Sequence, residues 1–294
     1  MSLLRRIGLL LFINFLVMVM VSVVIFVLSY LGFRIDGAGY YLVVSLVFGF
    51  GGSFISLWMS KGVAKRRYKV QLIDPNTASG RELFVLNAVR KMASQHQIRM
   101  PEVGIFDATS PNAFATGATK NSALVAFSSS LVNSLSEDEL AAVAGHEMTH
   151  ILKGDMVTMS LIIGVVNTFV MFLSYIVARA LDAALRDKRG RGGLGFFGYR
   201  IVYTILQNVL LLLAYIPISY YSRQREYRAD KGAAEMVSPR AMISALRALD
   251  VPLKPETNQQ AAANMAMINN KRKVSLYSTH PSIEDRIKAL EKML

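Results

Sequence analysis

Four long apolar segments dominate the pattern of hydrophobic and polar positions along the chain. They cover residues 7–33, 40–59, 156–178 and 201–221. A helix of about 20 apolar residues is long enough to cross the hydrocarbon core of a bilayer. The first segment exceeds the apolar part of a signal peptide and ends without a small-x-small cleavage site, which favours an uncleaved anchor. The pattern therefore predicts four transmembrane helices.

Small and polar residues inside these segments indicate how the helices pack. The second segment holds small residues that allow two helices to approach closely, namely Gly49, Gly51, Gly52 and Ser53. Polar side chains interrupt the third and fourth segments at Asn167, Gln207 and Asn208. Because such groups are costly against lipid, we expect them to form hydrogen bonds between helices.

The polar remainder of the chain forms two blocks, residues 60–155 and 222–294. In the first block, apolar residues at helical spacing predict a helix over residues 82–93. Short apolar runs separated by Gly, Ser, Pro and Asn predict the strands of a small sheet. These strands are expected over residues 103–106, 113–116 and 123–127.

Helix start signals mark three further helices. Ser136, followed three residues later by Glu139, forms a capping box, so a helix is expected to begin there. In the second block, Ser238 caps a helix that starts at Pro239. Ser282 is expected to cap a last helix. Together these patterns predict an α+β membrane protein.

Charge near the segment ends predicts the orientation in the membrane. A cluster of basic residues follows the second segment, namely Lys61, Lys65, Arg66, Arg67 and Lys69. Cytoplasmic loops carry such an excess, which places the N-terminus and the block after the second segment in the cytoplasm. The connection between the third and fourth segments would then lie outside, yet it is also basic. Either the rule is broken there, or this pair is a hairpin that does not fully cross.

The composition supports a membrane protein and limits its partners. Hydrophobic residues make up 53% of the chain, while charged residues make up only 18%, below the quarter usual in soluble domains. The formal net charge of +13 admits nucleic acid, anionic lipid or topology control as its reason. Because no recognition motif or basic run interleaved with aromatics occurs, we expect no nucleic-acid partner. The absence of cysteine excludes disulfides and thiolate chemistry.

The helix capped by Ser136 carries the sequence His146-Glu147-Met148-Thr149-His150. Residues four apart on an α-helix lie on one face, one turn apart. The two imidazoles can therefore bind a single Zn²⁺ ion. Glu147 lies beside the metal rather than on it, where a carboxylate can act as the general base for an attacking water. The motif predicts a zinc peptidase, with two surface histidines as the alternative.

A catalytic zinc site needs a third protein ligand and an open position. The histidines left over are His96 and His280, and the candidate carboxylates are Asp155, Glu226 and Asp230. The spacing alone does not choose among them. Two membrane segments separate Glu226 from the histidine helix, so an even number of crossings returns it to the same side.

The chain resembles the HtpX family of membrane zinc metalloproteases, relatives of the CAAX prenyl endopeptidases. The resemblance covers essentially the whole chain. Its specific motifs are three short stretches, namely Pro111 to Gly117, His146 to His150, and Arg225-Glu226-Tyr227-Arg228-Ala229-Asp230. It implies that Glu226 is the third zinc ligand, as in gluzincins, and that Asp230 orients a ligand histidine.

Two further site assignments follow from the same resemblance. Asn112, Ala113 and Phe114 resemble the edge strand on which such proteases bind an extended substrate, although an ordinary strand start after Pro111 fits equally. The stretch around His280 resembles the family's C-terminal His-Pro motif, which implies a role in stabilising the oxyanion. A capping or packing histidine is the alternative.

The resemblance and the motif together define the expected organisation. We expect two N-terminal transmembrane helices, the first part of a mainly helical zincin-type catalytic domain with a small β-sheet, two further membrane helices, and the second part of that domain. The corresponding ranges are 1–60, 61–155, 156–221 and 222–294.

The expected function is zinc-dependent endoproteolysis, with one Zn²⁺ per chain. The substrates would be polypeptides, chiefly membrane proteins in quality control, and the chain would be integral to the cytoplasmic membrane with its catalytic domain facing the cytoplasm. A processing protease for one defined peptide is the nearest alternative. A transporter with a structural metal site is disfavoured, because the apolar segments contain no central charged residue.

Overall fold

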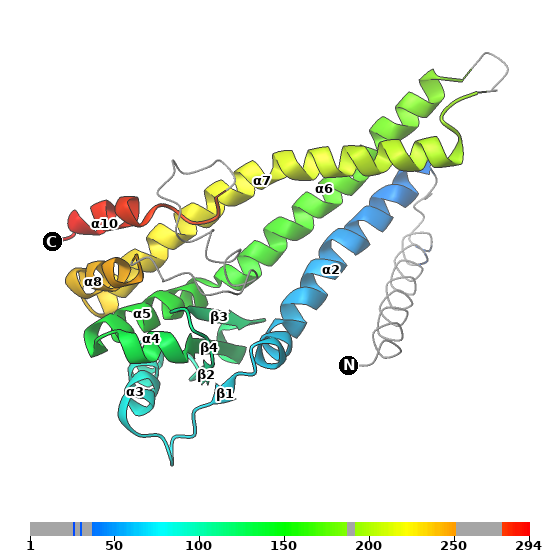
Figure 1. The fold of residues 1–294 in the computed structure, drawn as a ribbon. Helices are drawn as coiled ribbons and strands as arrows, with labels where there is room; N and C mark the ends of the chain where they lie inside the picture. Colours follow the sequence, from blue (N-terminus) through cyan, green and yellow to red (C-terminus); the bar gives the residue numbers. More distant parts are fainter. Residues whose placement is uncertain (1–25, 27–29, 31–36, 187–191, 251–277) are drawn as a thin grey trace. The chain divides into compact units, whose positions relative to one another are not determined.

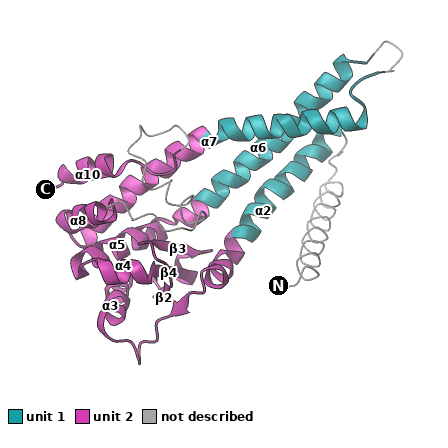
Figure 2. Ribbon diagram, viewed as in Figure 1, with its two compact units in different colours: residues 1–56, 159–215 teal, residues 57–158, 216–294 magenta. Residues whose placement is uncertain are grey.

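A computed structural model describes residues 26, 30, 37–186, 192–250 and 278–294. The first expected membrane segment, residues 7–33, lies almost wholly outside the described residues. The chain divides into two compact units, coloured separately in Figure 2. We call residues 1–56 and 159–215 the helical unit, and residues 57–158 and 216–294 the mixed unit.

Three described helices are long and apolar enough to cross a membrane. They are α2 (Gly37–Arg67), α6 (Asp155–Ala184) and α7 (Gly195–Met236), labelled in Figure 1, and each has residues in both units (Figure 2). They contain the second, third and fourth expected segments. α7 extends beyond the fourth apolar segment, as one helix of 42 residues with an internal Pro217.

Small residues bring α2 and α6 together within the helical unit. A Cβ atom on Gly49 would overlap Thr168, and one on Gly164 would lie 2.9 Å from the ring of Phe50. Thr168 also donates a hydrogen bond to the carbonyl of Ser45 across the helices, at 3.2 Å. The expected close approach therefore holds at Gly49.

The expected interhelical role of the polar residues in α7 is wrong. Gln207 donates to the hydroxyl of Tyr203, and Asn208 donates to the carbonyl of Thr204. Both partners lie one turn earlier on the same helix. A side chain of this length reaches the preceding turn at little entropic cost, so the helix itself satisfies the polar group.

A four-stranded sheet forms one layer of the mixed unit. Its order is β1 (Gln71–Leu72), β2 (Glu102–Phe106), β4 (Ala123–Ser128) and β3 (Ala113–Gly117). β2 and β4 are parallel, and the other two pairs are antiparallel. The three expected strands are present, whereas the two-residue β1 was not expected. β3 lies at the edge of the sheet, as the resemblance implied.

Helices cover the sheet and form the core of the mixed unit. They are α3 (Gly80–Gln95), α4 (Ser129–Ser134), α5 (Glu137–Lys153), α8 (Pro239–Leu249) and α10 (Ile283–Glu291), with a 3-10 turn over Lys120–Ser122. The core joins apolar residues of α3, α5 and α8 to one face of β2, β3 and β4. The start signals were read correctly, because Ser136, Ser238 and Ser282 each accept a hydrogen bond from the first turn of their helix.

The contact between α5 and the last part of α7 is lined by very small residues. A Cβ on Gly145 would lie 3.2 Å from the Cα of Ala233. A Cβ on Gly232 would overlap the hydroxyl of Thr149, which is buried and donates to the carbonyl of Gly145. The two backbones therefore approach closely, and any added methyl group must push them apart. We call this contact, formed by Gly145, Thr149, Gly232 and Ala233, the α5–α7 seam.

The substitution Gly232→Ala tests the seam. Overpacking of a close contact costs about 1–3 kcal/mol, so the melting temperature of the detergent-solubilised protein should fall. Gly62→Ala is the matched control, because a Cβ there meets no atom within 4 Å and alanine favours the helix by about 0.5–1 kcal/mol. Equal melting temperatures for the two variants would contradict the seam.

Candidate metal centre

Helix α5 holds His146 and His150 on one face. The capping box of Ser136 and Glu139 fixes its start, and Gly154, at φ +68°, ends it in a left-handed cap. The two imidazole rings lie 4.8 Å apart between centroids and are almost perpendicular. The helix thus places both histidines on the same face, one turn apart.

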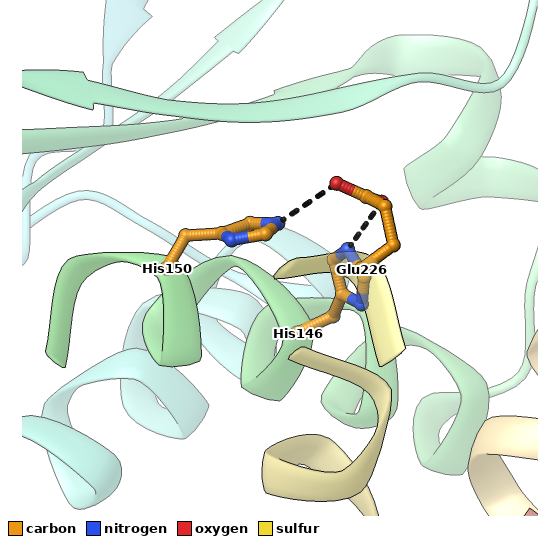
Figure 3. A group of neighbouring side chains, drawn as sticks. All are labelled: His146, His150 and Glu226. Atoms are coloured by element: carbon orange, nitrogen blue, oxygen red, sulfur yellow. Dashed lines mark ion pairs between the residues drawn. The ribbon is translucent and has the colours of Figure 1, made fainter. Parts of the chain in front are cut away.

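Glu226 reaches the two histidines from α7. Its Oε2 lies 3.5 Å from Nε2 of His146, and its Oε1 lies 3.7 Å from Nε2 of His150. Figure 3 shows the carboxylate facing both rings. One possible ligand atom from each residue lies within 4.8 Å of the others, so a single ion can bind all three. Two imidazoles and one carboxylate, with a fourth position left open, are a ligand set typical of catalytic zinc.

Each histidine is oriented by a buried aspartate. Nδ1 of His146 lies 2.9 Å from Oδ1 of Asp230, and Nδ1 of His150 lies 2.7 Å from Oδ2 of Asp155. A carboxylate at this position accepts a hydrogen bond from Nδ1–H, which keeps the ring proton on Nδ1 and leaves the Nε2 lone pair free to bind a metal. Both Nε2 atoms therefore face Glu226.

Helix α10 fixes Asp230 in turn. Arg286 donates from Nε to Oδ2 of Asp230 at 2.7 Å and from Nη2 to Oδ1 at 2.5 Å. A bidentate guanidinium holds a carboxylate in one plane, which a single ammonium does not. The C-terminal helix thus acts on His146 through Asp230.

The protein groups set the proton affinity of the site. Burial lowers the pKa of the His146 imidazole, but the hydrogen bonds with Asp230 and Glu226 outweigh it and raise that pKa to about 10. Burial likewise lowers the pKa of the Arg286 guanidinium, whereas Asp230 raises it above the usual value. The carboxylates that favour a proton on His146 also favour a divalent cation. A proton and a metal ion would therefore compete for Nε2 of His146, the nitrogen that faces Glu226.

The remaining sequence-derived site residues have different surroundings. Glu147 lies next to His146 on α5 and is buried. The side chain of His280 is 58% exposed, and its Nδ1 lies 3.2 Å from Oε2 of Glu226. His280 is therefore within reach of the metal centre from the solvent side, as a group acting on substrate would need to be.

The edge strand β3 presents its side chains to two faces. Ala113 and Ala115 pack against the core on the face that α5 covers. Phe114 lies on the opposite face, where its ring packs with the rings of Tyr68 and Phe106. The inclusion of Phe114 among the residues that contact substrate is therefore not supported by its side chain, because neighbouring residues of a strand point to opposite faces.

Two residues of the site were not recognised in their observed positions. Asp155 was considered only as a third ligand, but it is the partner of His150. Arg286 had no assigned role, although it holds Asp230. For Asp155 a local signal exists, because Gly154 ends the helix four residues after His150 and turns the next residue back towards it. Arg286 has no such signal, since only the tertiary contact reveals it.

Long apolar helices, a mixed α/β unit and a clustered His–His–Glu set are together typical of a membrane metallopeptidase. Residues 81–294 match the family model of peptidase family M48, and the chain belongs to this family. The chain is accordingly a metalloendopeptidase. The resemblance to HtpX proteases is thereby confirmed, as is the α+β membrane fold.

Individual relatives agree with this assignment. The chain is 43% identical to protease HtpX of Tolumonas auensis, over 98% of this chain and 99% of the relative. It is 45% identical to protease HtpX of Aeromonas hydrophila, over 97% and 99% of the two chains. The crystal structure of Ste24p from S. mikatae shares the fold, with a TM-score of 0.62 at 18% identity, and the match covers 98% of this chain and 64% of that one.

The substitution Asp155→Asn tests the orienting role of the buried aspartate. The amide of Asn carries no net charge, so its hydrogen bond with Nδ1–H of His150 is weaker than that of the carboxylate. The affinity for zinc should therefore fall by about 10–100-fold. Asp138→Asn, on the exposed start of the same helix, is the control and should bind zinc as the unchanged protein does. Competition with a chelator of known affinity measures both. Equal affinities would remove Asp155 from the site.

Proposed function

We propose that this chain is a zinc-dependent endopeptidase of the cytoplasmic membrane that hydrolyses peptide bonds of membrane proteins in quality control. The observation that carries the proposal is the convergence of His146 Nε2, His150 Nε2 and the Glu226 carboxylate beside Glu147. Zinc bound by these three residues would polarise the scissile carbonyl and make a water molecule more acidic.

The protein groups then handle the proton and the developing charge. Glu147, one residue after His146, accepts the proton of the attacking water and passes it to the leaving amine. His280, on the exposed side of Glu226, donates to the oxygen on which negative charge develops. Asp230 and Asp155 keep both ligand rings in the tautomer that leaves Nε2 available.

The placement of the site supports membrane proteins as substrates. Asp155 is the first residue of α6, and Glu226 lies in α7, so two helices long enough to cross a bilayer also carry residues of the centre. The basic cluster at the end of α2, from Lys61 to Lys69, supports a cytoplasmic location of the mixed unit. A protease held at this surface meets loops and ends of other membrane proteins first.

The free edge of β3 is suited to bind an extended substrate. The N–H of Ser128 donates to the carbonyl of Asn112, so Asn112, and by alternation Phe114 and Thr116, direct their backbone groups to β4. Ala113 and Ala115 therefore direct their N–H and C=O groups to the free edge. We infer that these two alanines pair with substrate, and that their small side chains leave space for it above α5.

Replacement of Glu147 by Gln tests the general base. Cleavage of a casein substrate should fall by about 100-fold or more, because the amide no longer accepts the water proton. Zinc content should be unchanged, since Glu147 is not a ligand. In contrast, Glu226→Ala should lose both zinc and activity. Retention of the wild-type rate by Glu147→Gln would reject the mechanism, and mapping several unrelated cut sites in one substrate would reject a processing protease.

The variant Ala115→Pro tests the binding edge. Proline is tolerated on an edge strand whose N–H faces away from the sheet, so the fold should survive. Loss of one hydrogen bond to substrate of about 1 kcal/mol should raise KM about fivefold. Ala115→Ser keeps the N–H and is the control. If both variants had the KM of the unchanged enzyme, substrate would not pair with this edge.

A further inference from the structure

Five tyrosines gather at one end of the helical unit. They come from the start of α2, the end of α6 and the start of α7, namely Tyr40, Tyr41, Tyr175, Tyr199 and Tyr203. The rings of Tyr41 and Tyr175 stack at 3.6 Å, and those of Tyr199 and Tyr203 stack at 6.3 Å. Tyrosine rings concentrate where hydrocarbon meets water, so this end lies at a membrane interface.

Three exposed arginines lie at the end of α6 and the start of α7. Arg179 lies near the Tyr199 hydroxyl, and Arg200 lies near Tyr203. Arg186 pairs with Asp182 at 2.7 Å, whereas Arg179 and Arg200 form no ion pair with any other residue that the structure describes. Asp182 is occupied on its other oxygen by the N–H of Leu194 at 2.9 Å. Arg179 has Asp182 only as a more distant electrostatic neighbour, so Arg179 and Arg200 can both bind an anion from outside the protein.

The start of α7 adds an exposed apolar pair. Phe196 and Phe197 are 80% and 79% exposed, and their rings pack edge to face. Two neighbouring aromatic side chains at this exposure are unfavourable in water but suited to the boundary between headgroups and acyl chains. They follow Leu194, whose N–H donates to Asp182. The exposed phenylalanines and the arginines thus lie at the same end of the helical unit.

The length of α6 favours a full crossing over a hairpin that ends within the bilayer. Its 30 residues extend about 45 Å, which exceeds the ~30 Å of hydrocarbon that a hairpin must cross. A full crossing would place the basic end at the interface opposite to the start of α6. The usual role of such charge, retention in the cytoplasm, does not explain it there. Another ligand for the arginines is required.

We propose that this end of the helical unit binds the headgroups of anionic phospholipids. Arg179, Arg186 and Arg200 are placed to contact phosphate, for which guanidinium groups are well suited. Phe196, Phe197, Tyr199 and Tyr203 occupy about the first two turns of α7 beside them, so these rings can lie at the headgroup boundary together with the arginines. The hairpin would thereby be fixed across the bilayer against the ordinary charge rule.

Lipid-specific fluorescence quenching in nanodiscs tests the proposal with the full-length protein. Trp58 is the only tryptophan, so Trp58→Phe combined with Phe197→Trp places a single fluorophore at this end. Brominated phosphatidylglycerol and brominated phosphatidylcholine are compared at equal mole fraction. Quenching should be stronger with the brominated anionic lipid. Each cation near an anionic surface adds about fivefold to the relative affinity, so replacement of all three arginines by Gln should remove the preference.

The control variant gives the same change in net charge. It replaces three exposed basic residues of the mixed unit by Gln, namely Lys91, Lys231 and Arg240. The preference should persist there. Arg200→Gln alone should lower it several-fold, which keeps the test valid if the triple variant fails to fold. Equal quenching by the two lipids, or a preference unchanged by the arginine substitutions, would overturn the proposal. Quenching by neither lipid would show that this end lies in water, available to a protein partner instead.

Discussion

Close packing of α5 against α7 is possible because the α5–α7 seam carries almost no side-chain volume. Gly145 faces Ala233, and Gly232 faces Thr149. At this separation the carboxylate of Glu226, less than two turns before Gly232 on α7, reaches the Nε2 atoms of both histidines. A bulkier seam would move α7 outwards, and the third ligand atom would leave the range in which one ion can bind all three. The metal centre therefore depends on residues that have no chemistry of their own.

The seam also brings several buried charges together, which would be unfavourable without partners. Glu226, Asp230 and Asp155 each face an imidazole, and Arg286 neutralises Asp230 through two hydrogen bonds. Such a network loses stability when one member is removed, because the remaining charges stay buried. A divalent cation at the centre would balance the excess of carboxylates. The same network thus explains both the orientation of the ligands and the preference for a metal.

The two ends of α6 and α7 carry residues with different proposed roles. At one end, α6 begins with Asp155 and α7 carries Glu226, so the helices take part in the candidate metal centre. At the other end, the tyrosines and arginines of the helical unit are suited to the membrane interface. If lipid fixes that end, it also fixes the position of α6 and α7 along the membrane normal. The same two helices would then take part in both membrane anchoring and the candidate metal centre.

The sequence by itself determined the features that depend on neighbours along the chain. Helical periodicity places His146 and His150 on one face, and Ser136, Ser238 and Ser282 mark the starts of three helices. The length of the apolar segments predicts helices that can cross a membrane. Glu226 was identified through family resemblance and Asp230 likewise, because no local rule connects residues 84 positions apart such as His146 and Asp230.

Only the tertiary structure decided the direction of Phe114 and the edge position of Ala113 and Ala115. It also gave Asp155 and Arg286 their places. The physical reason is the same in each case. Strand order and hydrogen bonds between elements far apart in the chain depend on how those elements pack together, which the pattern of any one segment does not contain.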